Sequence, residues 1–472
     1  MALIQSFSGI RGIFGEDLNE DIARRYSYCY YSFLKKKNEK PTVVIGNDPR
    51  HSSLILKKAI FDVFENIIDV GIATTPMIEL AVREYKADGG IIITASHNEP
   101  EWNGFKFLDK DGAVLRPDDI NIIINDFKKI KNLNETDFLN NYLYKATKIH
   151  RITKKHSAII KKYSDFVLKT ITKKNIKLIK KSKIKFILDP NGGSAIILKR
   201  ILDDFGLDFV GVNMNYGEFN RLIEPNKESL AYLQKVIKEN NADLAFGFDC
   251  DADRVEVVLP DGDVISGNYI LALIVDDVLS ALKKPEKETV VVNDATSNLV
   301  KEIADKNRAN LKEVEVGEIN VIDAMLNHNS VIGGEGSSSG IIFPPSRCRD
   351  GMLTLLAVLK IIAKRKKQLG GIIKEYPKYY NLKEKIEFDF KQHDKIKEEL
   401  KNYYLKKGFK IKETGDITGG LKILIGDKSW IFFRASKTEE GTFRIIVDSS
   451  SKEKADELMK EAREIFKKFK YD

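Results

Sequence analysis

The sequence predicts an α/β protein in which three similar α/β units precede a smaller α+β domain. Short apolar runs alternate with longer amphipathic stretches along most of the chain, which is typical of α/β layers with a parallel or mixed sheet. This alternation restarts three times, and near residue 370 it gives way to apolar runs that are joined by short turns. At 472 residues the chain is also too long for a single hydrophobic core.

The strands of the three α/β units are predicted from their apolar runs. These runs cover residues 42–46, 90–94, 184–189, 242–249, 289–294 and 329–335. Amphipathic patterns between them predict helices, for example over 54–67 and 229–241. After the first, third and fifth runs the chain passes in the same way from apolar strand to polar turn to helix, which indicates a triplicated unit.

The C-terminal part predicts a separate α+β domain, because short turns join its strands and one amphipathic helix follows them. Its apolar runs cover 385–390, 422–427, 429–436 and 442–450. We therefore expect four domains, with boundaries good to about four residues. They cover residues 1–147, 148–257, 258–368 and 369–472.

The composition indicates a globular protein of a reducing compartment. Hydrophobic residues make up 43% of the chain and charged residues 31%. We find no run of about 18 apolar residues that would span a membrane, and no secretion signal at the N-terminus. Three cysteines without a CxxC pair argue against a disulfide or zinc framework. We expect a cytoplasmic protein.

The net charge of +9 raises the question of an anionic partner. Lysines concentrate at 35–37, at 173–185 and near the C-terminus. Because these runs lack interleaved aromatic residues and known nucleic-acid motifs, we interpret them as solvated helix faces. We expect neither a nucleic acid nor a membrane as partner.

The stretch GGIIITASHNEPEWNGFKF, residues 89–107, carries the first candidate site. An apolar strand ends there and is followed by Ser96, His97 and Asn98. Strands of open α/β sheets deliver ligand-binding groups just beyond their carboxyl ends. The alternative for Ser96 is an ordinary turn serine. Ser96 is not the serine of a hydrolase elbow, because the pattern G-x-S-x-G does not surround it.

Three aspartates in GFDCDADR, residues 247–254, form the strongest single signal. Asp249, Asp251 and Asp253 alternate directly after an apolar run, so an extended loop would point them to one side. Three anions this close require a hard cation, unless the segment is a solvated acidic turn. A calcium loop is excluded because its sixth position is Arg254 and its twelfth is Pro260. We expect Mg²⁺, with Arg254 closing the loop.

Two further loops offer groups for a phosphorylated sugar. GGEGSSSG, residues 333–340, combines glycines with Glu335 and serines suited to sugar hydroxyls, and a flexible loop is the alternative. FRASKTEEGTFR, residues 433–444, suits a phosphate, and a polar hairpin is the alternative. We call four residues of this loop the phosphate clamp: Arg434, Ser436, Thr438 and Arg444. Together the four loops indicate phosphoryl transfer on a sugar phosphate.

The motifs TASHNEPEWNGFK, DCDADR, GGEGSSSG and RASKTE, in this order and spacing, resemble the α-D-phosphohexomutase superfamily. SGIRGIFGEDL and GNDPRHSS are similar to the first domain of that family, so the resemblance covers essentially the whole chain. It implies three similar α/β domains with mixed sheets around a central cleft, plus a smaller C-terminal α+β domain. It also points to an archaeal-type member.

The resemblance implies roles for individual residues. Ser96 would be carried as phosphoserine, and His97 would support its loop. Lys106 and Arg11 would lie near the transferring phosphate, with Lys106 as a candidate proton carrier. The implied ligands of one Mg²⁺ are Ser96, Asp249, Asp251 and Asp253. The implied substrate-binding residues are Arg254, Glu335, Ser337, Ser339, Arg434, Ser436, Thr438 and Arg444.

The activity that the resemblance implies is a phosphoglucomutase/phosphomannomutase. It would interconvert hexose 1-phosphate and hexose 6-phosphate through a hexose 1,6-bisphosphate, which is also the expected activator. Phosphoglucosamine mutase is the alternative. A non-catalytic scaffold that binds sugar phosphates is a distant alternative, because the serine and all three aspartates are present. A monomer and a homo-oligomer are both left open.

Overall fold

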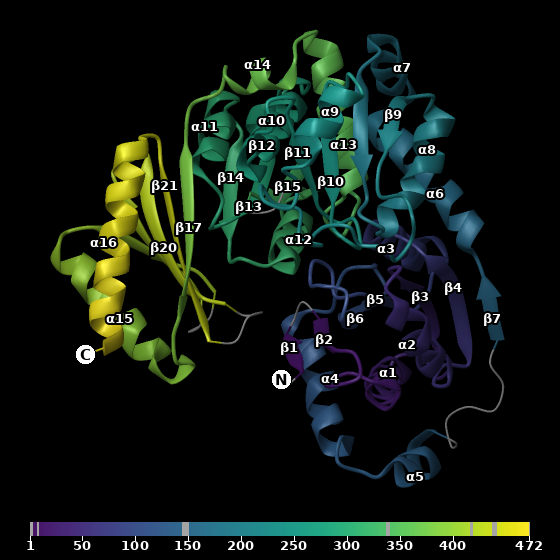
Figure 1. Cartoon of the computed structure of the whole chain (residues 1–472). Helices are drawn as coiled ribbons and strands as arrows, with labels where there is room; N and C mark the ends of the chain where they lie inside the picture. Colours follow the sequence, from purple (N-terminus) through teal and green to yellow (C-terminus); the bar gives the residue numbers. More distant parts are fainter. Residues whose placement is uncertain are drawn as a thin grey trace. The chain divides into compact units, whose positions relative to one another are not determined.

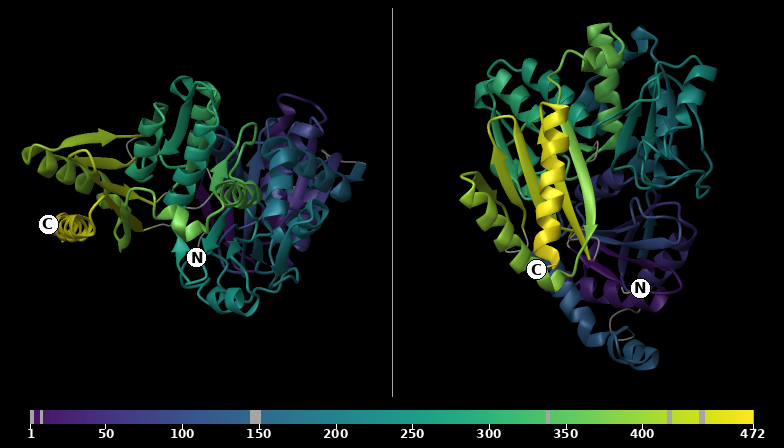
Figure 2. Two further views of the ribbon diagram at one scale, coloured as in Figure 1. Left: turned by 90° about the horizontal axis from the view of Figure 1, so that it is seen from above. Right: turned by 60° about the vertical axis from the view of Figure 1, so that its left-hand side comes forward.

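The computed structural model describes residues 3–6, 9–143, 151–336, 340–415, 419–436 and 441–471. The chain forms two compact units (Figure 1 and Figure 2). The first comprises Met1–Ile265 and Gly340–Lys367, and the second comprises Ser266–Ser339 and Gln368–Asp472. Among the helices of the described residues, none is both long enough and apolar enough to cross a membrane.

The first unit begins with a seven-stranded mixed sheet. Its order is β1 (Ile4–Ser6), β2 (Gly9–Ile13), β6 (Trp102–Leu108), β5 (Gly89–Ile93), β3 (Thr42–Asn47), β4 (Asn66–Ile72) and β7 (Arg151–Lys154). β3 pairs in parallel with β4 and β5, whereas β6 runs antiparallel to β5 and β2. The helices on one face are α1 (Glu20–Lys35), α2 (His51–Phe61) and α4 (Pro117–Ile130). Those on the other are α3 (Thr75–Glu84) and α6 (His156–Ile171).

Capping residues set the starts of two of these helices. The side chain of Thr74 accepts a hydrogen bond from the N–H of Met77, and Pro76 lies in the first turn of α3. Asn19 caps α1 in the same way through the N–H of Ile22. The cap fixes where α3 begins, next to the candidate metal site.

β2 and β6 approach each other closely because Gly104 has no side chain. A Cβ atom on Gly104 would lie 2.1 Å from the carbonyl oxygen of Ile10. Arg11 is the register partner of Gly104, and Lys106 follows two residues later on the same strand. Side chains of directly opposed and alternate residues share a face of a sheet. Arg11 and Lys106 therefore lie on one face.

The second sheet of the first unit has five strands. Its order is β12 (Val264–Ile265), β11 (Val255–Val258), β10 (Leu244–Phe248), β8 (Lys185–Asp189) and β9 (Asp208–Gly211). The remaining α-helices and strands of this unit are α5 (Glu135–Phe138), α7 (Lys173–Ser182), α8 (Leu198–Phe205), α9 (Leu233–Glu239), β16 (Gly340–Ile342) and α13 (Gly351–Arg365). The sheet passes beyond the expected domain boundary at 257, because that residue lies within β11 and β12 follows it. The four domain limits remain a proposal.

The second unit contains three parallel strands, β14 (Asn310–Val314), β13 (Thr289–Asn293) and β15 (Ile332–Glu335). Its helices are α10 (Gly267–Ser280), α11 (Asn298–Lys306), α12 (Glu318–Asn327) and α14 (Leu369–Ile373). An antiparallel sheet follows in the order β17 (Tyr380–Glu387), β21 (Thr442–Ser449), β20 (Ser429–Ala435), β19 (Leu421–Ile425) and β18 (Lys410–Glu413). α15 (His393–Lys406), yellow-green in Figure 1, and α16 (Lys452–Tyr471), yellow, cover one face of it. On the other face Trp430 and Phe432 pack with Ala295.

The predicted fold class of three α/β domains with mixed sheets and a C-terminal α+β domain is confirmed. The helix predicted over 54–67 is wrong in its second half, because α2 ends at Phe61 and β4 begins at Asn66. The C-terminal domain contains a second helix, α15, and an edge strand, β18, that the prediction omits. The buried residues of α15 follow the helical spacing in the sequence: His393, Ile396, Leu400 and Tyr404.

Candidate active site

Ser96 lies in the loop that follows β5. Its side chain is buried, and its backbone φ of +53° is unusual for a residue with a side chain. The backbone N–H of Ser96 donates to Thr94 Oγ1 at 2.8 Å, and Arg50 Nη2 donates to the Ser96 carbonyl oxygen at 3.0 Å. Arg50 also donates to the carbonyl oxygen of Asn98 and is paired with Asp48. A buried guanidinium thus holds the loop in this strained conformation.

The three aspartates after β10 converge as the sequence indicates, but for a different reason. One side-chain oxygen from each of Asp249, Asp251 and Asp253 lies within 4.8 Å of the others, and all three residues are buried. The segment is a turn, not the extended loop that the alternation suggested. Ala252 adopts a φ of +58° within this turn. The turn, and not strand alternation, brings the carboxylates together.

The serine and the aspartates meet in the first unit. Ser96 Oγ donates to Asp249 Oδ2 at 3.3 Å. Burial raises the pKa of Asp249 well above its ordinary value, and the neighbouring charges of Asp253 and Asp251 raise it further. An added cation would relieve this repulsion.

Cationic side chains surround the aspartates. Lys106 Nζ lies 2.7 Å from Asp251 Oδ2 and 3.6 Å from Asp253 Oδ2, and Arg349 Nη2 lies 2.8 Å from Asp253 Oδ2. Arg254 lies farther away, with its Nε 3.8 Å from Asp253 and 3.9 Å from Asp249. Burial alone would raise the pKa of Asp253, but Arg349 and Lys106 outweigh it and hold the pKa below its ordinary value.

The aspartates fit a magnesium ion. The Oδ2 atoms of Asp251 and Asp253 accept from Lys106 and Arg349, whereas the Oδ1 atoms of both aspartates are buried and have no hydrogen-bond partner among the described residues. Buried oxygens normally have a partner. A set of carboxylate oxygens with a serine oxygen beside it is the donor chemistry that Mg²⁺ prefers.

Arg11 and His97 lie beside Ser96. Arg11, on β2, donates to Asn98 Oδ1 at 2.8 Å, and burial together with Arg254 lowers its pKa to about 10. His97 Nδ1 lies 3.4 Å from Ser96 Oγ. Burial and the charges of Arg254 and Arg11 lower the pKa of His97 well below 6.5, so its imidazole is neutral near pH 7.

Sequence reasoning missed three residues of this site. Thr75, the first residue of α3, donates from Oγ1 to Asp251 Oδ2 at 2.7 Å and from its backbone N–H to the Asp251 carbonyl at 2.9 Å. Arg50 holds the serine loop, and Arg349 neutralises Asp253. The motif GNDPRHSS points to Arg50, whereas Thr75 and Arg349 reach the site only through folding.

The second unit carries the predicted sugar-binding and phosphate-binding residues. Glu335 is the buried last residue of β15, and its Oε1 accepts from Asn293 Nδ2 at 2.8 Å and from the N–H of Gly317 at 3.3 Å. Ser337 and Ser339 lie outside the described residues.

Two arginines of the phosphate clamp lie side by side. Arg434 on β20 is the register partner of Arg444 on β21. Burial lowers the pKa of Arg434, and the charge of Arg444 lowers it further. Like charges directly opposed on a sheet are destabilising, so this arrangement favours an anion between or beside them. The N–H of Ser436 donates to the Thr442 carbonyl at 2.8 Å, and Thr438 lies outside the described residues.

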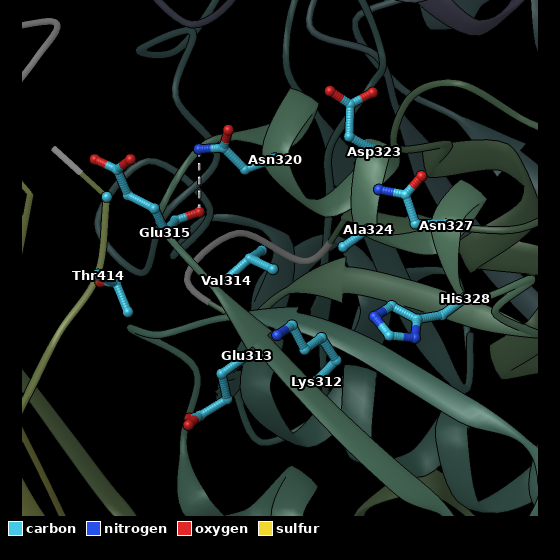
Figure 3. Close-up of a pocket in the computed structure, with 11 residues that line it drawn as sticks. Lys312, Glu313, Val314, Glu315, Asn320, Asp323, Ala324, Asn327, His328 and Thr414 are labelled. Carbon is cyan, nitrogen blue, oxygen red and sulfur yellow. Dashed lines mark hydrogen bonds between the residues drawn. The ribbon is translucent and has the colours of Figure 1, made fainter.

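A cavity of about 550 Å³ opens elsewhere in the second unit, between β14, α12 and the residues after β18 (Figure 3). Most of the residues that line it are polar, among them Glu315, Asp323 and His328. It contains none of the predicted site residues.

Comparisons with known proteins agree with the fold. Models of the phosphoglucomutase/phosphomannomutase alpha/beta/alpha domains I, II and III match residues 3–134, 161–262 and 266–380. A phosphoglucomutase/phosphomannomutase from Thermococcus kodakarensis is 35% identical over 464 residues, covering 96% of this chain and 95% of that protein. A probable phosphoglucosamine mutase from Pyrococcus abyssi is 31% identical and covers 98% and 97%.

A solved structure has the same fold. The crystal structure of a phosphoglucomutase/phosphomannomutase family protein from Burkholderia thailandensis matches with a TM-score of 0.81 at 20% identity. The match covers 99% of this chain and 97% of that chain. The three domain models and the archaeal relatives place the chain among mutases, which are isomerases. The chain belongs to the phosphoglucomutase/phosphomannomutase family of the α-D-phosphohexomutase superfamily.

Proposed function

We propose that this phosphohexomutase acts on glucose and mannose phosphates and interconverts their 1-phosphates and 6-phosphates. The observation that carries the proposal is the contact between the buried hydroxyl of Ser96 and Asp249, within an aspartate cluster that fits Mg²⁺. The name of the Thermococcus relative supports this choice of sugars.

Ser96 carries the phosphoryl group in the proposed mechanism. The bond between phosphorus and Ser96 Oγ breaks while a bond to the free hydroxyl oxygen of the hexose phosphate forms, and the proton that this hydroxyl loses ends on Ser96 Oγ. The transition state of such a transfer is loose and spreads negative charge over the phosphoryl oxygens. Lys106 and Arg11 offset this charge, and the neutral His97 supports the serine loop.

Lys106 is also the proposed proton carrier in this transfer. Its ammonium group contacts Asp251 and Asp253.

The proposed ligands of Mg²⁺ are Ser96, Asp249, Asp251 and Asp253. When bound, the ion supplies positive charge to the transferring phosphoryl group. An N-acetylphosphoglucosamine mutase from Aspergillus fumigatus was solved with GlcNAc-6P and magnesium, which supports this cofactor. Arg349 and Lys106 hold the second oxygens of two of the aspartates and so orient the carboxylates.

The residues of the second unit bind the part of the substrate that does not react. The phosphate clamp holds the phosphate that is not transferred, and Arg254 of the first unit contributes to substrate binding. Glu335, with Ser337 and Ser339, binds sugar hydroxyls. The bisphosphate intermediate must turn end for end between the two transfers, so the same residues serve both orientations.

Phosphoglucosamine mutase is the second candidate, because relatives carry that name. The Pyrococcus abyssi protein is named a probable phosphoglucosamine mutase at 31% identity. The two activities differ only in the group at C2 of the sugar. A comparison of rates on the three sugars therefore decides between them.

The test is a coupled assay with Mg²⁺ and catalytic glucose 1,6-bisphosphate. Glucose 1-phosphate, mannose 1-phosphate and glucosamine 1-phosphate are compared at equal concentration. Ser96→Ala should abolish turnover, whereas Ser194→Ala, a buried serine whose N–H contacts the Cys250 carbonyl, should retain it. Turnover by Ser96→Ala at the wild-type rate would refute the serine's role. Failure of all three sugars would refute the proposed substrates.

Hexose 1,6-bisphosphate is the proposed activator, because Ser96 must receive a phosphoryl group before the first turnover. Protein treated with a phosphatase should be inactive until the bisphosphate is added, and intact mass should show one phosphate afterwards. Full activity of never-phosphorylated protein without the bisphosphate would contradict the phosphoserine.

We also infer a cytoplasmic location, with small hexose phosphates as the partners of the chain. Among the described residues no disulfide joins Cys29, Cys250 or Cys348, and all three are buried. This supports a reducing compartment.

A further inference from the structure

Asn293, the last residue of β13, joins this strand to the neighbouring strand β15. It is fully buried, and its Nδ2 donates to Glu335 Oε1 at 2.8 Å. β13 and β15 are parallel, so the two residues lie at the same edge of the sheet, where ligands bind in α/β folds.

The orientation of the Asn293 amide is fixed by its other contacts. Its Oδ1 accepts from the backbone N–H of Ala295 at 3.2 Å and from Thr296 Oγ1 at 2.9 Å. A backbone N–H can only donate, so the oxygen of the amide must face Ala295. The NH₂ group must therefore face Glu335.

The same loop also holds the residue that follows Glu335. The N–H of Gly336 donates to Thr296 Oγ1 at 3.2 Å, and that hydroxyl donates to Asn293. On its other side Glu335 Oε1 accepts from the N–H of Gly317 at 3.3 Å. Asn293, Thr296 and the turn before α12 thus fix both the carboxylate and the backbone at the end of β15.

An uncharged donor suits this position. A buried carboxylate requires hydrogen-bond donors, and a lysine or arginine at residue 293 would also neutralise it. Asn293 supplies the hydrogen bond and leaves the negative charge for sugar hydroxyls. Glu335 is one of the charged groups that act on the Arg434 guanidinium, and the others are Arg444, Asp294 and Glu315.

We propose that Asn293 is a positioning residue that orients the Glu335 carboxylate for the hydroxyl groups of the hexose. This inference rests on the proposed function, because it takes Glu335 as a sugar-binding residue. It deepens that function by assigning a buried side chain that acts on the substrate only through Glu335.

A double-mutant cycle tests whether Asn293 acts through Glu335. We would measure the dissociation constant of glucose 6-phosphate by calorimetry in a Ser96→Ala background, which prevents turnover. Asn293→Ala should raise this constant about 10-fold and Glu335→Ala about 10- to 100-fold, as expected for lost hydrogen bonds to charged groups. The double variant should match Glu335→Ala within about 2-fold. If the dissociation constant of the double variant rises by the product of the two single-variant factors, the two residues act independently and the inference is overturned.

A second arm uses pH, which a merely structural role would not affect. Asn293→Asp places a carboxylate against Glu335, and two such groups retain one proton between them at low pH. Relative to the parent protein, Asn293→Asp should bind as weakly as Asn293→Ala at pH 8 and recover at pH 6. Asn293→Ala should show no recovery. Equal binding by Asn293→Asp and the parent at both pH values would also overturn the inference.

Asn307→Asp is the matched control. Asn307 Nδ2 donates to Asp276 Oδ1 at 2.9 Å, so this variant creates a similar carboxylate pair in the same unit. Asn307 directly follows the last residue of α11. The helix is about 14 Å long, and its first residue is the end that lies near the site. It should lower stability without changing the pH dependence of binding.

The outcomes separate this inference from the proposed function. If the parent protein binds glucose 6-phosphate but wild type turns over no hexose phosphate, the mutase proposal fails and the cycle still decides the role of Asn293. If the parent binds no hexose phosphate at all, both are overturned.

Discussion

The hydroxyl of Thr75 gives a sharp test of the metal site, because it contacts the proposed ligand Asp251 without being a proposed ligand itself. Its Oγ1 donates to Asp251 Oδ2 at 2.7 Å, and both residues are buried. Asp251 Oδ1 has no hydrogen-bond partner among the residues that the structure describes, so it is the oxygen available to an ion. Thr75→Val removes the hydroxyl and keeps the β-branched shape.

The expected loss follows from the charge of the acceptor. A hydrogen bond to a charged group contributes about 1.5–3 kcal/mol, and about 1.4 kcal/mol corresponds to a tenfold change in affinity. Groups that orient metal ligands commonly contribute about 10- to 100-fold to metal affinity. We therefore expect the dissociation constant of Mg²⁺ to rise about 10- to 100-fold in Thr75→Val.

Calorimetric titration with Mg²⁺ measures this effect, and Thr74→Val is its control. Thr74 is equally buried and caps α3, so its loss should cost about 1 kcal/mol of stability without touching Asp251. Wild-type Mg²⁺ affinity in Thr75→Val would refute the reasoning. A wild-type protein that binds no divalent cation would instead refute the metal proposal.

Three further predictions concern the first unit. Burial raises the pKa of Asp350 to about 6, whereas the pKa is about 3.9 in an unfolded chain. Between these two pH values the folded protein binds one more proton than the unfolded chain, so the free energy of unfolding falls as the pH rises from about 3.9 through 6. Urea unfolding should show that the free energy of unfolding of wild type falls by about 1.4 kcal/mol more than that of Asp350→Asn between pH 5 and pH 8. If the two proteins have parallel plots of unfolding free energy against pH, the raised pKa is contradicted. Arg50 donates from Nη2 to both carbonyls of the Ser96 loop while its Nη1 pairs with Asp48, and the single ammonium group of a lysine cannot reproduce this fork. In Arg50→Lys kcat should therefore fall about 100-fold, and an unchanged kcat would show that the loop keeps its conformation without Arg50. Gly104→Ala should lower the free energy of unfolding by about 1–3 kcal/mol, because the added Cβ atom would lie 2.1 Å from the carbonyl oxygen of Ile10. An unchanged free energy of unfolding would mean that β2 and β6 can move apart at this position.

Strands with long apolar runs were predictable from the sequence because burial on both faces leaves little choice of residue. β3, β5, β8, β10 and β13 all fall on the predicted runs. The end of α2 was not predictable in this way, because the apolar residues of β4 continue the helical spacing. Domain limits depend on which strands pair, and the residues of a strand do not indicate its partner. β12, for example, lies beyond the expected boundary at 257 and pairs with β11.

The sequence by itself determined the chemistry: which residues could carry a phosphoryl group, bind a cation or bind a phosphate. The convergence of Asp249, Asp251 and Asp253 was predicted from their spacing, but a turn produces it and not the extended loop on which that prediction was based. Only the tertiary structure decided which neighbours support them. Thr75, Arg349 and Asn293 lie far from their partners along the chain, and ordinary buried residues of these types carry no local signal. Their roles arise because packing removes water and leaves each buried carboxylate dependent on the donor that folding brings to it.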